Sequence, residues 1–440
     1  MEFFMRKILA LFLAGTASMS YAESDLITLY NEAVKSYPSL NISINDEKVA
    51  KSQADQGLAL LMPNVTGTAA YSATSATGDN DADVRFDDGA MSYEIEATQA
   101  IFNLYAVKLY DAFKENVSAT KYSTQVTQQT LMVSVADNYF SVLTAKDTVE
   151  SVKSQLAAVK RQQEQTEQQY EVGLAAITDV LDAQASYDAT QVMLIEAEAS
   201  YDTALQNFAV LTGRVPSSLK TLPKEVALPE AETSSANEWV EVAFKTHPSI
   251  LATTQTSKYV EKSFAATKAN RLPTVGGSIS YTYTDYLNEV PGYYEDGGTT
   301  AVAISVSVPI YTGGQTSAEI VEAGLNYNSA LQNLELTKRN VELAVRQAHR
   351  QLTADIANVA AKKKAVESSS KALDATQVGY DVGTRNIVEV LAAQSTLYSS
   401  KLSYQTAQYD YLLDILKLKQ AAGVITSDDL VSLNNLLISE

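Results

Sequence analysis

Residues 380–394 read Tyr380-Asp-Val-Gly-Thr-Arg-Asn-Ile-Val-Glu-Val-Leu-Ala-Ala-Gln394, and residues 170–184 read Tyr170-Glu-Val-Gly-Leu-Ala-Ala-Ile-Thr-Asp-Val-Leu-Asp-Ala-Gln184. The shared glycines, Gly173 and Gly383, are separated by a fixed interval (383 − 173 = 210). The same interval relates pairs far outside the motif: Pro38 and Pro248, Pro63 and Pro273, Gly67 and Gly277, Tyr71 and Tyr281, Tyr201 and Tyr411, and Gly213 and Gly423. The sequence therefore indicates a tandem duplication, and the repeat unit decides the fold.

The first 22 residues have the features of a secretory signal peptide. Two basic residues precede the apolar run 8–14, and residues 20–22 read Ser-Tyr-Ala, which has the small-x-small form of a cleavage site. The apolar run is too short to span a membrane. We therefore expect the segment 1–22 to be removed and the mature chain to leave the cytoplasm.

The composition excludes several classes of function. The chain contains no cysteine, which excludes disulfides, thiolate metal sites, a cysteine nucleophile and a lipid anchor on an N-terminal cysteine. A formal net charge of −19 disfavours binding to nucleic acid, whose phosphates carry the same sign of charge. With two histidines and no glycine-rich phosphate loop, we find no catalytic constellation, and we expect no enzymatic activity, no cofactor and no metal site.

Each repeat contains a segment with the alternating pattern of a β-hairpin, at 64–102 and at 274–311. On the last strand Val302, Ile304 and Val306 alternate with smaller residues such as Ala303 and Ser305. The acidic loop 74–89 lacks the spacing of a calcium loop, so we interpret it as a solvated outer loop. One apolar face, one polar face and a long loop are typical of a membrane barrel strand, although a soluble sandwich is the alternative. After residue 22 no apolar run reaches the ~18 to 20 residues of a membrane helix.

Each hairpin is followed by a long helical tract, 103–170 or 315–380, and by a shorter return helix, 177–212 or 387–421. In the first tract Val135, Val142, Val149 and Leu156 recur every seven residues, which predicts a left-handed coiled coil. At 1.5 Å per residue the outgoing helix is about 100 Å long and the return helix about 52 Å. The chain is expected to turn at Gly173 and Gly383, because glycine adopts positive φ without strain.

These elements define the expected domains. The first repeat covers 23–213 and begins with a helix, and the second repeat covers 238–423. Two further segments lie outside the repeats: the linker 214–237, which contains three prolines, and the C-terminal tail 424–440. We expect both to form an equatorial belt around the helices.

Four strands per chain cannot close a barrel, and an open sheet edge in lipid would leave unpaired N–H and C=O groups that each cost several kcal/mol. Two copies would supply eight strands and three copies would supply twelve. An eight-stranded barrel is filled by its own side chains, whereas a wider one can hold a water path. The small residues Ala303, Ser305 and Ser307 favour the wider version. The fold class expected is therefore α+β: a trimeric membrane β-barrel, four strands from each chain, continuous with an antiparallel coiled-coil tunnel.

The duplicated Tyr-x-Val-Gly-x-x-x-Ile motif, the secretory signal and the hairpins preceded by Met-Pro or Leu-Pro resemble the bacterial outer-membrane efflux proteins, also called outer membrane factors. The likeness covers essentially the whole mature chain. It implies a homotrimer in the outer-membrane lipid of a Gram-negative bacterium, extending into the periplasm. Such a channel serves as an exit duct for drugs, small toxic compounds and proteins of type I secretion. It works with an inner-membrane pump and a periplasmic adaptor.

The resemblance also implies a gate at the tunnel tip, held by bonds between neighbouring helical hairpins. At the matching positions Tyr380 would bond Gln162, and Arg385 would reach Thr178 and Asp179. A charge-assisted hydrogen bond between an arginine and a carboxylate contributes about 1.5 to 3 kcal/mol. The latch would therefore keep the resting duct closed.

The family also places two acidic positions in the narrowest part of the tunnel. Glu389 occupies the first position, but Ala392 occupies the second, which puts a two-tier acidic ring in doubt. Asp182 lies at the repeat equivalent of Ala392 and is the candidate replacement. The turns at Gly173 and Gly383 are the expected docking points for the adaptor.

Two other interpretations remain open. A periplasmic coiled-coil adaptor would also have a long helical hairpin, but in one copy and without alternating strands. A secreted structural coiled-coil protein would carry its helices at the chain ends rather than interleaved with strands. Dependence on detergent separates both of these from a membrane duct.

Overall fold

The computed structural model describes residues 24–76, 86–216, 218–223, 228–229, 235–287 and 295–438. The expected signal peptide, most of the acidic loop 74–89 and parts of the linker 214–237 lie outside the described residues. The chain divides into two compact units. The hairpin unit comprises the described residues up to Ile42, Gln125–His247 and those from Arg339 onward; the sheet unit comprises Ser43–Thr124 and Pro248–Lys338.

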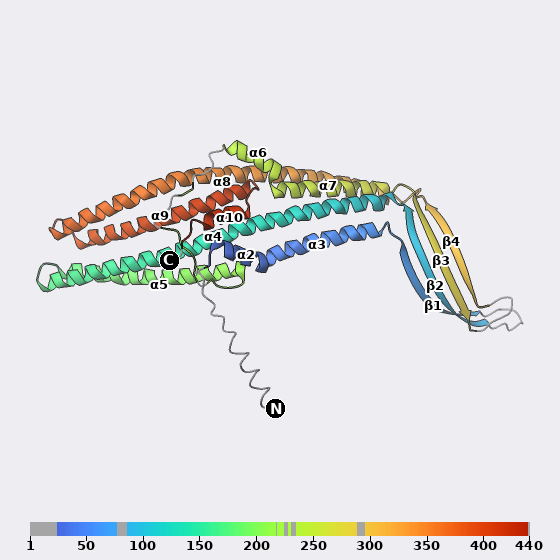
Figure 1. The fold of residues 1–440 in the computed structure, drawn as a ribbon, viewed down its shortest axis with the longest axis horizontal. Helices are drawn as coiled ribbons and strands as arrows, with labels where there is room; N and C mark the ends of the chain where they lie inside the picture. The colour runs from blue at the N-terminus through green and yellow to red at the C-terminus, as the bar shows by residue number, and fades with distance from the viewer. Residues whose placement is uncertain are drawn as a thin grey trace, which may run out of the picture. The chain divides into compact units, whose positions relative to one another are not determined.

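The sheet unit contains one antiparallel sheet in the order β1-β2-β3-β4, with the four strands side by side in Figure 1. Its strands are β1 (Asn64–Ala76), β2 (Phe86–Phe102), β3 (Thr274–Tyr286) and β4 (Gly297–Ser307). The pairing of β2 with β3 joins the β-hairpin of the first repeat to the β-hairpin of the second. The return strand of the second hairpin ends at Ser307, short of the expected limit at 311. Only β1 and β4 have a neighbour on one side alone, so they are the edges of the described sheet.

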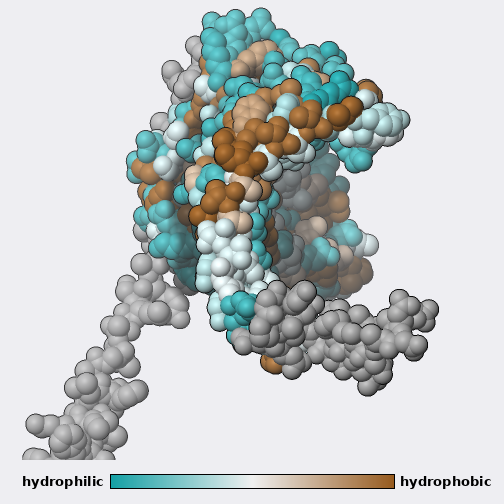
Figure 2. Space-filling model, turned by 90° about the vertical axis from the view of Figure 1, so that its right-hand side faces the viewer, coloured by the Kyte–Doolittle hydropathy of each residue, from teal (hydrophilic) through white to brown (hydrophobic). Residues whose placement is uncertain are grey.

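The register places polar residues on one face of the sheet and apolar residues on the other. Thr68 on β1 pairs with Glu94 on β2, which pairs with Thr282 on β3. One residue along, the opposite face carries Ile95 of β2 paired with Tyr281 of β3. The apolar face is exposed to solvent, and Figure 2 shows hydrophobic side chains at the surface of the side that carries the strands. Its two most exposed members, Val302 and Ile304, lie on β4.

Tyrosine rings cover glycines on neighbouring strands of this face. The hydroxyl of Tyr71 lies over Gly89, and the ring of Tyr281 lies over Gly298. A methyl group added at Gly298 would overlap that ring, so the close approach requires glycine there. Tyr71 and Tyr281 are repeat equivalents, so both β-hairpins contain a tyrosine that packs over a glycine of the neighbouring strand.

Most of the remaining described residues lie in helices. Proline opens α3 and α7 at the first helical position, where its missing N–H costs nothing. The helices are α2 (Leu26–Ser36), α3 (Pro38–Ala59), α4 (Leu104–Glu171), α5 (Ile177–Thr212), α6 (Ala236–Thr246), α7 (Pro248–Ala269), α8 (Gln315–Asp381), α9 (Ile387–Ala421) and α10 (Ser427–Asn434). Within residues 24–438, apart from the gaps given above, no helix is both long and apolar enough to cross a membrane.

The hairpin unit packs two helical hairpins, α4 with α5 and α8 with α9 (Figure 1). The heptad positions Val135, Val142 and Val149 of α4 are buried, as the seven-residue pattern predicts for a coiled-coil core. In the same unit α2 packs against α5 and against α10, and α5 contacts α9. Two isolated bridges fasten the connecting segments: Ser24 with Leu219, and Thr221 with Ile438.

Candidate gate at the turns of the helical hairpins

Both long helices end in the same turn. Gly173 and Gly383 have φ of 78° and 79°, a conformation that side chains disfavour. The N–H of Gly173 donates to the carbonyl of Tyr170 (2.9 Å), and the N–H of Leu174 donates to that of Gln169 (2.7 Å). The second copy repeats both bonds, from Gly383 to Tyr380 and from Thr384 to Gly379. This pair of bonds defines the Schellman motif, which terminates a helix and reverses the chain.

The return helices begin with acidic residues that cap their first turns. The carboxylate of Glu389 accepts the N–H of Asn386 (3.2 Å), and the side chain of Asn386 accepts the N–H of Glu389 (2.9 Å). In the first copy Asp179 accepts the N–H of Ala176 (3.1 Å). Such bonds satisfy donors that a helix start leaves unpaired. Glu389, the predicted pore acid, and Asp179, the predicted latch partner, therefore also hold their own helices in place.

Arg385 lies across the end of α8 and binds Glu389. Its Cγ occupies the space that a side chain at Gly379 would need, and its Nη1 lies 3.1 Å from Oε1 of Glu389. This ion pair is exposed, and within the chain it replaces the contacts expected from Arg385 to Thr178 and Asp179. The reason is proximity: Arg385 lies in the turn just before α9, and Glu389 lies in the first turn of that helix. Arg385 therefore neutralises part of the charge of Glu389 within the chain.

Tyr380 links the two hairpins through a different residue from the one expected. Its hydroxyl donates to Oε1 of Gln169 (2.8 Å), not to Gln162. Gln162 lies seven residues earlier on the same face of α4, two turns farther from the hairpin end. It is 5% exposed, and its Nε2 has no hydrogen-bond partner among the residues described. Because Tyr380 sits in the last turn of α8, its ring reaches the last turn of α4 instead.

An apolar cluster holds α9 against α4 just beyond the turns. Val159 of α4 is buried against Ile387, Val390 and Leu391 of α9, with Tyr380 packed beside them. Ile387 and Val390 are both 0% exposed. Full burial of such side chains stabilises the contact by about 1.5 to 3 kcal/mol each. The second copy of the motif is therefore fastened to the first hairpin within one chain.

The first copy of the motif has no such cover within the chain. Ile177, the equivalent of Ile387, is 50% exposed, and Leu181, the equivalent of Leu391, is 61% exposed. Thr178 and Asp182 are also exposed, as is Ala392. Within one chain the structure therefore brings Tyr380, Gln169, Arg385 and Glu389 together, but leaves Thr178, Asp179 and Asp182 apart from them.

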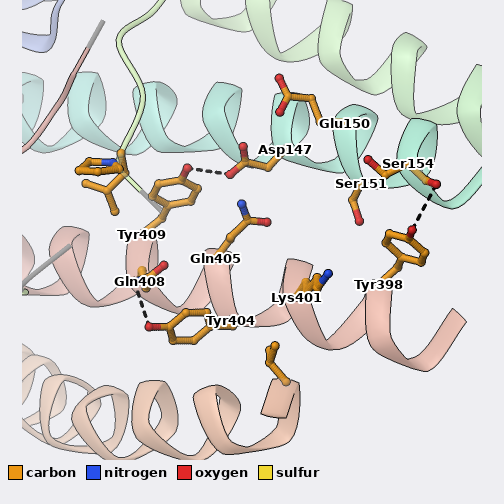
Figure 3. A pocket seen from close by; sticks show the side chains of 13 residues that line it. Asp147, Glu150, Ser151, Ser154, Tyr398, Lys401, Tyr404, Gln405, Gln408 and Tyr409 are labelled. Carbon is orange, nitrogen blue, oxygen red and sulfur yellow. Dashed lines mark hydrogen bonds between the residues drawn. The ribbon is translucent and has the colours of Figure 1, made fainter. Parts of the chain in front are cut away.

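Farther along the same seam, tyrosines of α9 bind α4 (Figure 3). Tyr398 donates to the carbonyl of Ser154 (3.2 Å), and Tyr409 donates to Asp147 (2.7 Å). Burial and the neighbouring Asp147 carboxylate raise the pKa of Tyr409, so this phenol remains a donor. A cavity of about 500 Å³ lies between the two contacts, with Ser151 and Gln405 in its wall. Sequence reasoning missed these tyrosines and Gln169, because no pattern along one helix shows which neighbouring helix its residues face.

The duplicated fold and these turns place the chain in a known class. Residues 29–214 and 239–424 each match the outer membrane efflux protein family, so the chain belongs to that family. The two matches confirm the two-fold repeat. They decide against the adaptor and the secreted coiled-coil protein, and they confirm the assignments as an outer-membrane protein and an efflux channel.

Relatives and solved structures agree with this family. The outer membrane protein TolC of Vibrio cholerae is 32% identical over 437 residues, covering 98% of both chains. The alkaline protease secretion protein AprF of Pseudomonas aeruginosa is 25% identical over 418 residues, covering 92% of this chain and 85% of its own. The CmeC outer membrane channel of Campylobacter jejuni superposes with a TM-score of 0.80 at 16% identity, covering 95% of this chain and 91% of that one. The structural likeness confirms the α+β fold class.

Proposed function

We propose that three copies of the chain form one exit duct through the outer membrane, for drugs, small toxic compounds and secreted proteins. The observation that carries this proposal is the sheet. One face exposes valine, isoleucine and tyrosine, and the other carries Glu94 and Glu96 beside threonines and serines. A wall with lipid on one side and water on the other needs this division.

The edges of the sheet support assembly with further copies. β1 and β4 each pair on one side only, and an open edge cannot be left in lipid. Joining β4 of one chain to β1 of the next removes every edge when the ring closes. Three copies would supply twelve strands, enough to enclose water.

The exposed face of α5 is a second observation that supports assembly, because it leaves apolar residues for the helices of a neighbouring chain to cover. Within one chain α9 packs on α4, and the equivalent face of α5 carries Ile177 and Leu181 with no cover. Val378 near the end of α8 is 63% exposed. We expect α5 of one chain to meet α8 of the next, as α9 meets α4. Such head-to-tail contacts close into a ring rather than a pair.

In this trimer the gate would combine contacts within and between chains. Tyr380 and Gln169 tie the two hairpins of one chain. Arg385, now paired with Glu389, would exchange to Thr178 and Asp179 of the neighbouring chain, because the second hairpin of one chain lies beside the first hairpin of the next. Opening would move α9 away from the axis and break both kinds of contact.

Glu389 and Asp182 would supply the acids of the constriction. Glu389 gives three carboxylates per trimer, one from each chain, and Asp182 three more if its exposed carboxylate faces the axis. The turns at Gly173 and Gly383 would meet a periplasmic adaptor, which would connect the duct to an inner-membrane pump. The turns are suited to docking because Leu174 and Val382 expose apolar side chains there.

Single-channel conductance of the purified protein in planar bilayers tests the proposal. We expect a small conductance for the wild type and a severalfold larger one for Tyr380→Phe combined with Arg385→Ser. Equal large conductance in both would retain the duct and reject the gate. No conductance in either would reject the duct.

A further inference from the structure

A carboxyl group occupies a core position of α8 in the hairpin unit. The buried residues of this helix recur at coiled-coil spacing, as Val341, Val345, Leu352 and then Asp355. Asp355 is 4% exposed, in a place where the pattern calls for an aliphatic side chain. An ionised carboxylate is costly to bury unless it is fully paired.

Asp355 is only half paired. Its Oδ1 accepts a hydrogen bond from Nε2 of Gln351 (3.1 Å), while its Oδ2 has no donor among the described residues. The neighbouring group is another carboxyl, that of Asp414 on α9, which is 7% exposed. Two carboxyl oxygens form a hydrogen bond only when a proton lies between them. The unpaired, buried Oδ2 beside a second buried carboxyl group therefore favours one proton at this point.

The charges around the pair favour keeping one negative charge, not two. Nζ of Lys417 lies 2.9 Å from Oδ1 of Asp414 and pairs with one negative charge there. Asp410 on α9 and Asp137 on α4 add negative charge, and Lys362 on α8 adds positive charge. No set of three or more acidic or histidine residues in the described chain could hold a metal ion instead.

Burial and the hydrogen bond to Asp414 raise the pKa of Asp355 from its ordinary value of 3.8 to about 6. Because this pKa is higher in the packed structure than in a separated one, the packed structure binds the proton more tightly. The stabilisation is fully present below about pH 4 and is lost as the pH rises through 6. The first repeat has Ala145 and Ala204 at the equivalent positions, so only α8 and α9 carry this pair.

We propose that Asp355 and Asp414 hold one proton between them, and that this proton fastens α8 to α9. Losing the proton leaves two facing carboxylates, which repel each other and loosen α9 along its length. On the proposed function, on which this inference rests, α9 is the helix that moves when the duct opens. The pair then makes the closed duct more stable in mild acid and easier to open at neutral pH.

Infrared spectroscopy tests the shared proton directly on the full-length protein. A buried protonated carboxyl gives a C=O stretching band that ionised carboxylates lack. We expect the wild type to lose such a band as the pH rises through 6. Asp355→Asn, which keeps the shape and can donate its amide N–H to Asp414, is expected to lack it. Asp374→Asn, an exposed aspartate on the same helix, is the matched control and is expected to keep it.

Conductance between pH 5 and pH 8 tests the effect on opening. A tenfold change in the opening equilibrium corresponds to each pH unit between the lower end of the range and the pKa, so from pH 5 to pH 8 we expect the opening equilibrium of the wild type to rise by about tenfold. Asp355→Asn is expected to stay near the acid value throughout. Asp414→Asn also removes the titration, which keeps the test valid if one variant fails to fold. Glu389 is unchanged in every variant, so its contribution to conductance cancels in the comparison.

A band that persists in Asp355→Asn, or the same pH dependence of opening in the wild type and in both Asn variants, would overturn the inference. Absence of conductance in every variant at every pH would instead overturn the proposed duct. The infrared titration would still decide whether the two carboxyls share a proton.

Discussion

The two copies of the hairpin motif have the same turn and different surroundings. Gly173 and Gly383 reverse the chain with the same hydrogen bonds. The return helices begin at Ile177 and Ile387, and each has an acidic residue, Asp179 or Glu389, in its first turn. Yet Ile387 is completely buried while Ile177 is half exposed. Residues close in sequence therefore determine the conformation of the turn, whereas residues of other helices determine whether the helix after the turn is buried.

The polar contacts follow the same division. Tyr380 binds Gln169 across the seam, while Tyr170, its equivalent, is exposed at the end of α4. Arg385 has Ala175 as its counterpart, so only the second copy carries a cation at the turn. One copy is therefore held within the chain, and the other is left uncovered within it. Four substitutions test this difference between the two copies, and they are given in order of decreasing effect.

The largest effect is expected for Leu181→Asp on the exposed face of the first copy. A carboxylate buried between chains without a partner costs several kcal/mol at each contact, and a trimer repeats that cost three times. We expect folded protomers that no longer assemble, measured as mass by light scattering in detergent and as helicity by circular dichroism. Trimers of normal stability would show that this face of α5 lies outside the interface. Leu391→Asp, the matched change, is expected to impair folding of the protomer itself.

Ile387→Ala is expected to destabilise the protomer by about 2 to 5 kcal/mol, because it empties a fully buried site against Val159. Ile177→Ala, at the equivalent position, is expected to change the stability of the dissociated protomer by about 0.5 kcal/mol or less. Denaturant unfolding of the two variants under dissociating conditions measures the difference. Equal losses would mean that the two copies are covered alike within one chain.

Tyr380→Phe removes one hydrogen bond across the seam while keeping the ring in place. The expected loss is about 0.5 to 1.5 kcal/mol of the contact between the hairpins, with a corresponding rise in opening. Tyr170→Phe is the control, since its hydroxyl is at the exposed equivalent position. If conductance rises equally in both variants, the hydrogen bond between Tyr380 and Gln169 does not help to keep the gate closed.

The smallest effect on folding is expected for Arg385→Ser. An exposed pair at this spacing contributes about 0.3 to 0.5 kcal/mol, so unfolding of the protomer is expected to change little. A much larger effect on conductance than on folding would point to contacts of Arg385 with a neighbouring chain. If Arg385→Ser changes conductance as little as it changes folding, Arg385 pairs with Glu389 alone.

Much of the architecture could be predicted from the sequence because its determinants are local. Glycine at 173 and 383, the seven-residue pattern of α4 and the alternation of the strands each act through the backbone within a few residues. The family, the fold class and the outer-membrane location followed from the duplicated motif, and the matches confirm them. The assignments of Thr178, Asp179 and Asp182 depend on a second chain and stay predictions.

The partners of the site residues could not be predicted in the same way. Gln162 and Gln169 occupy the same face of α4 one heptad apart, and sequence spacing does not distinguish them. In the structure Tyr380 binds Gln169, because the last turn of α8 lies beside the last turn of α4. Arg385 was expected to reach across to another hairpin, but within the chain it pairs with Glu389 in the first turn of the helix that follows it.

By itself the sequence determined that the chain repeats a strand-and-helix unit twice, where each unit turns, and which family it joins. Those properties depend on backbone freedom, on the periods of helix and strand, and on motif identity. Only the tertiary structure decided that Ile387 is buried and Ile177 is not, that Tyr380 binds Gln169, and that Asp355 meets Asp414. These contacts join residues far apart along the chain, and their free energies depend on how helices pack side by side, which no single segment encodes.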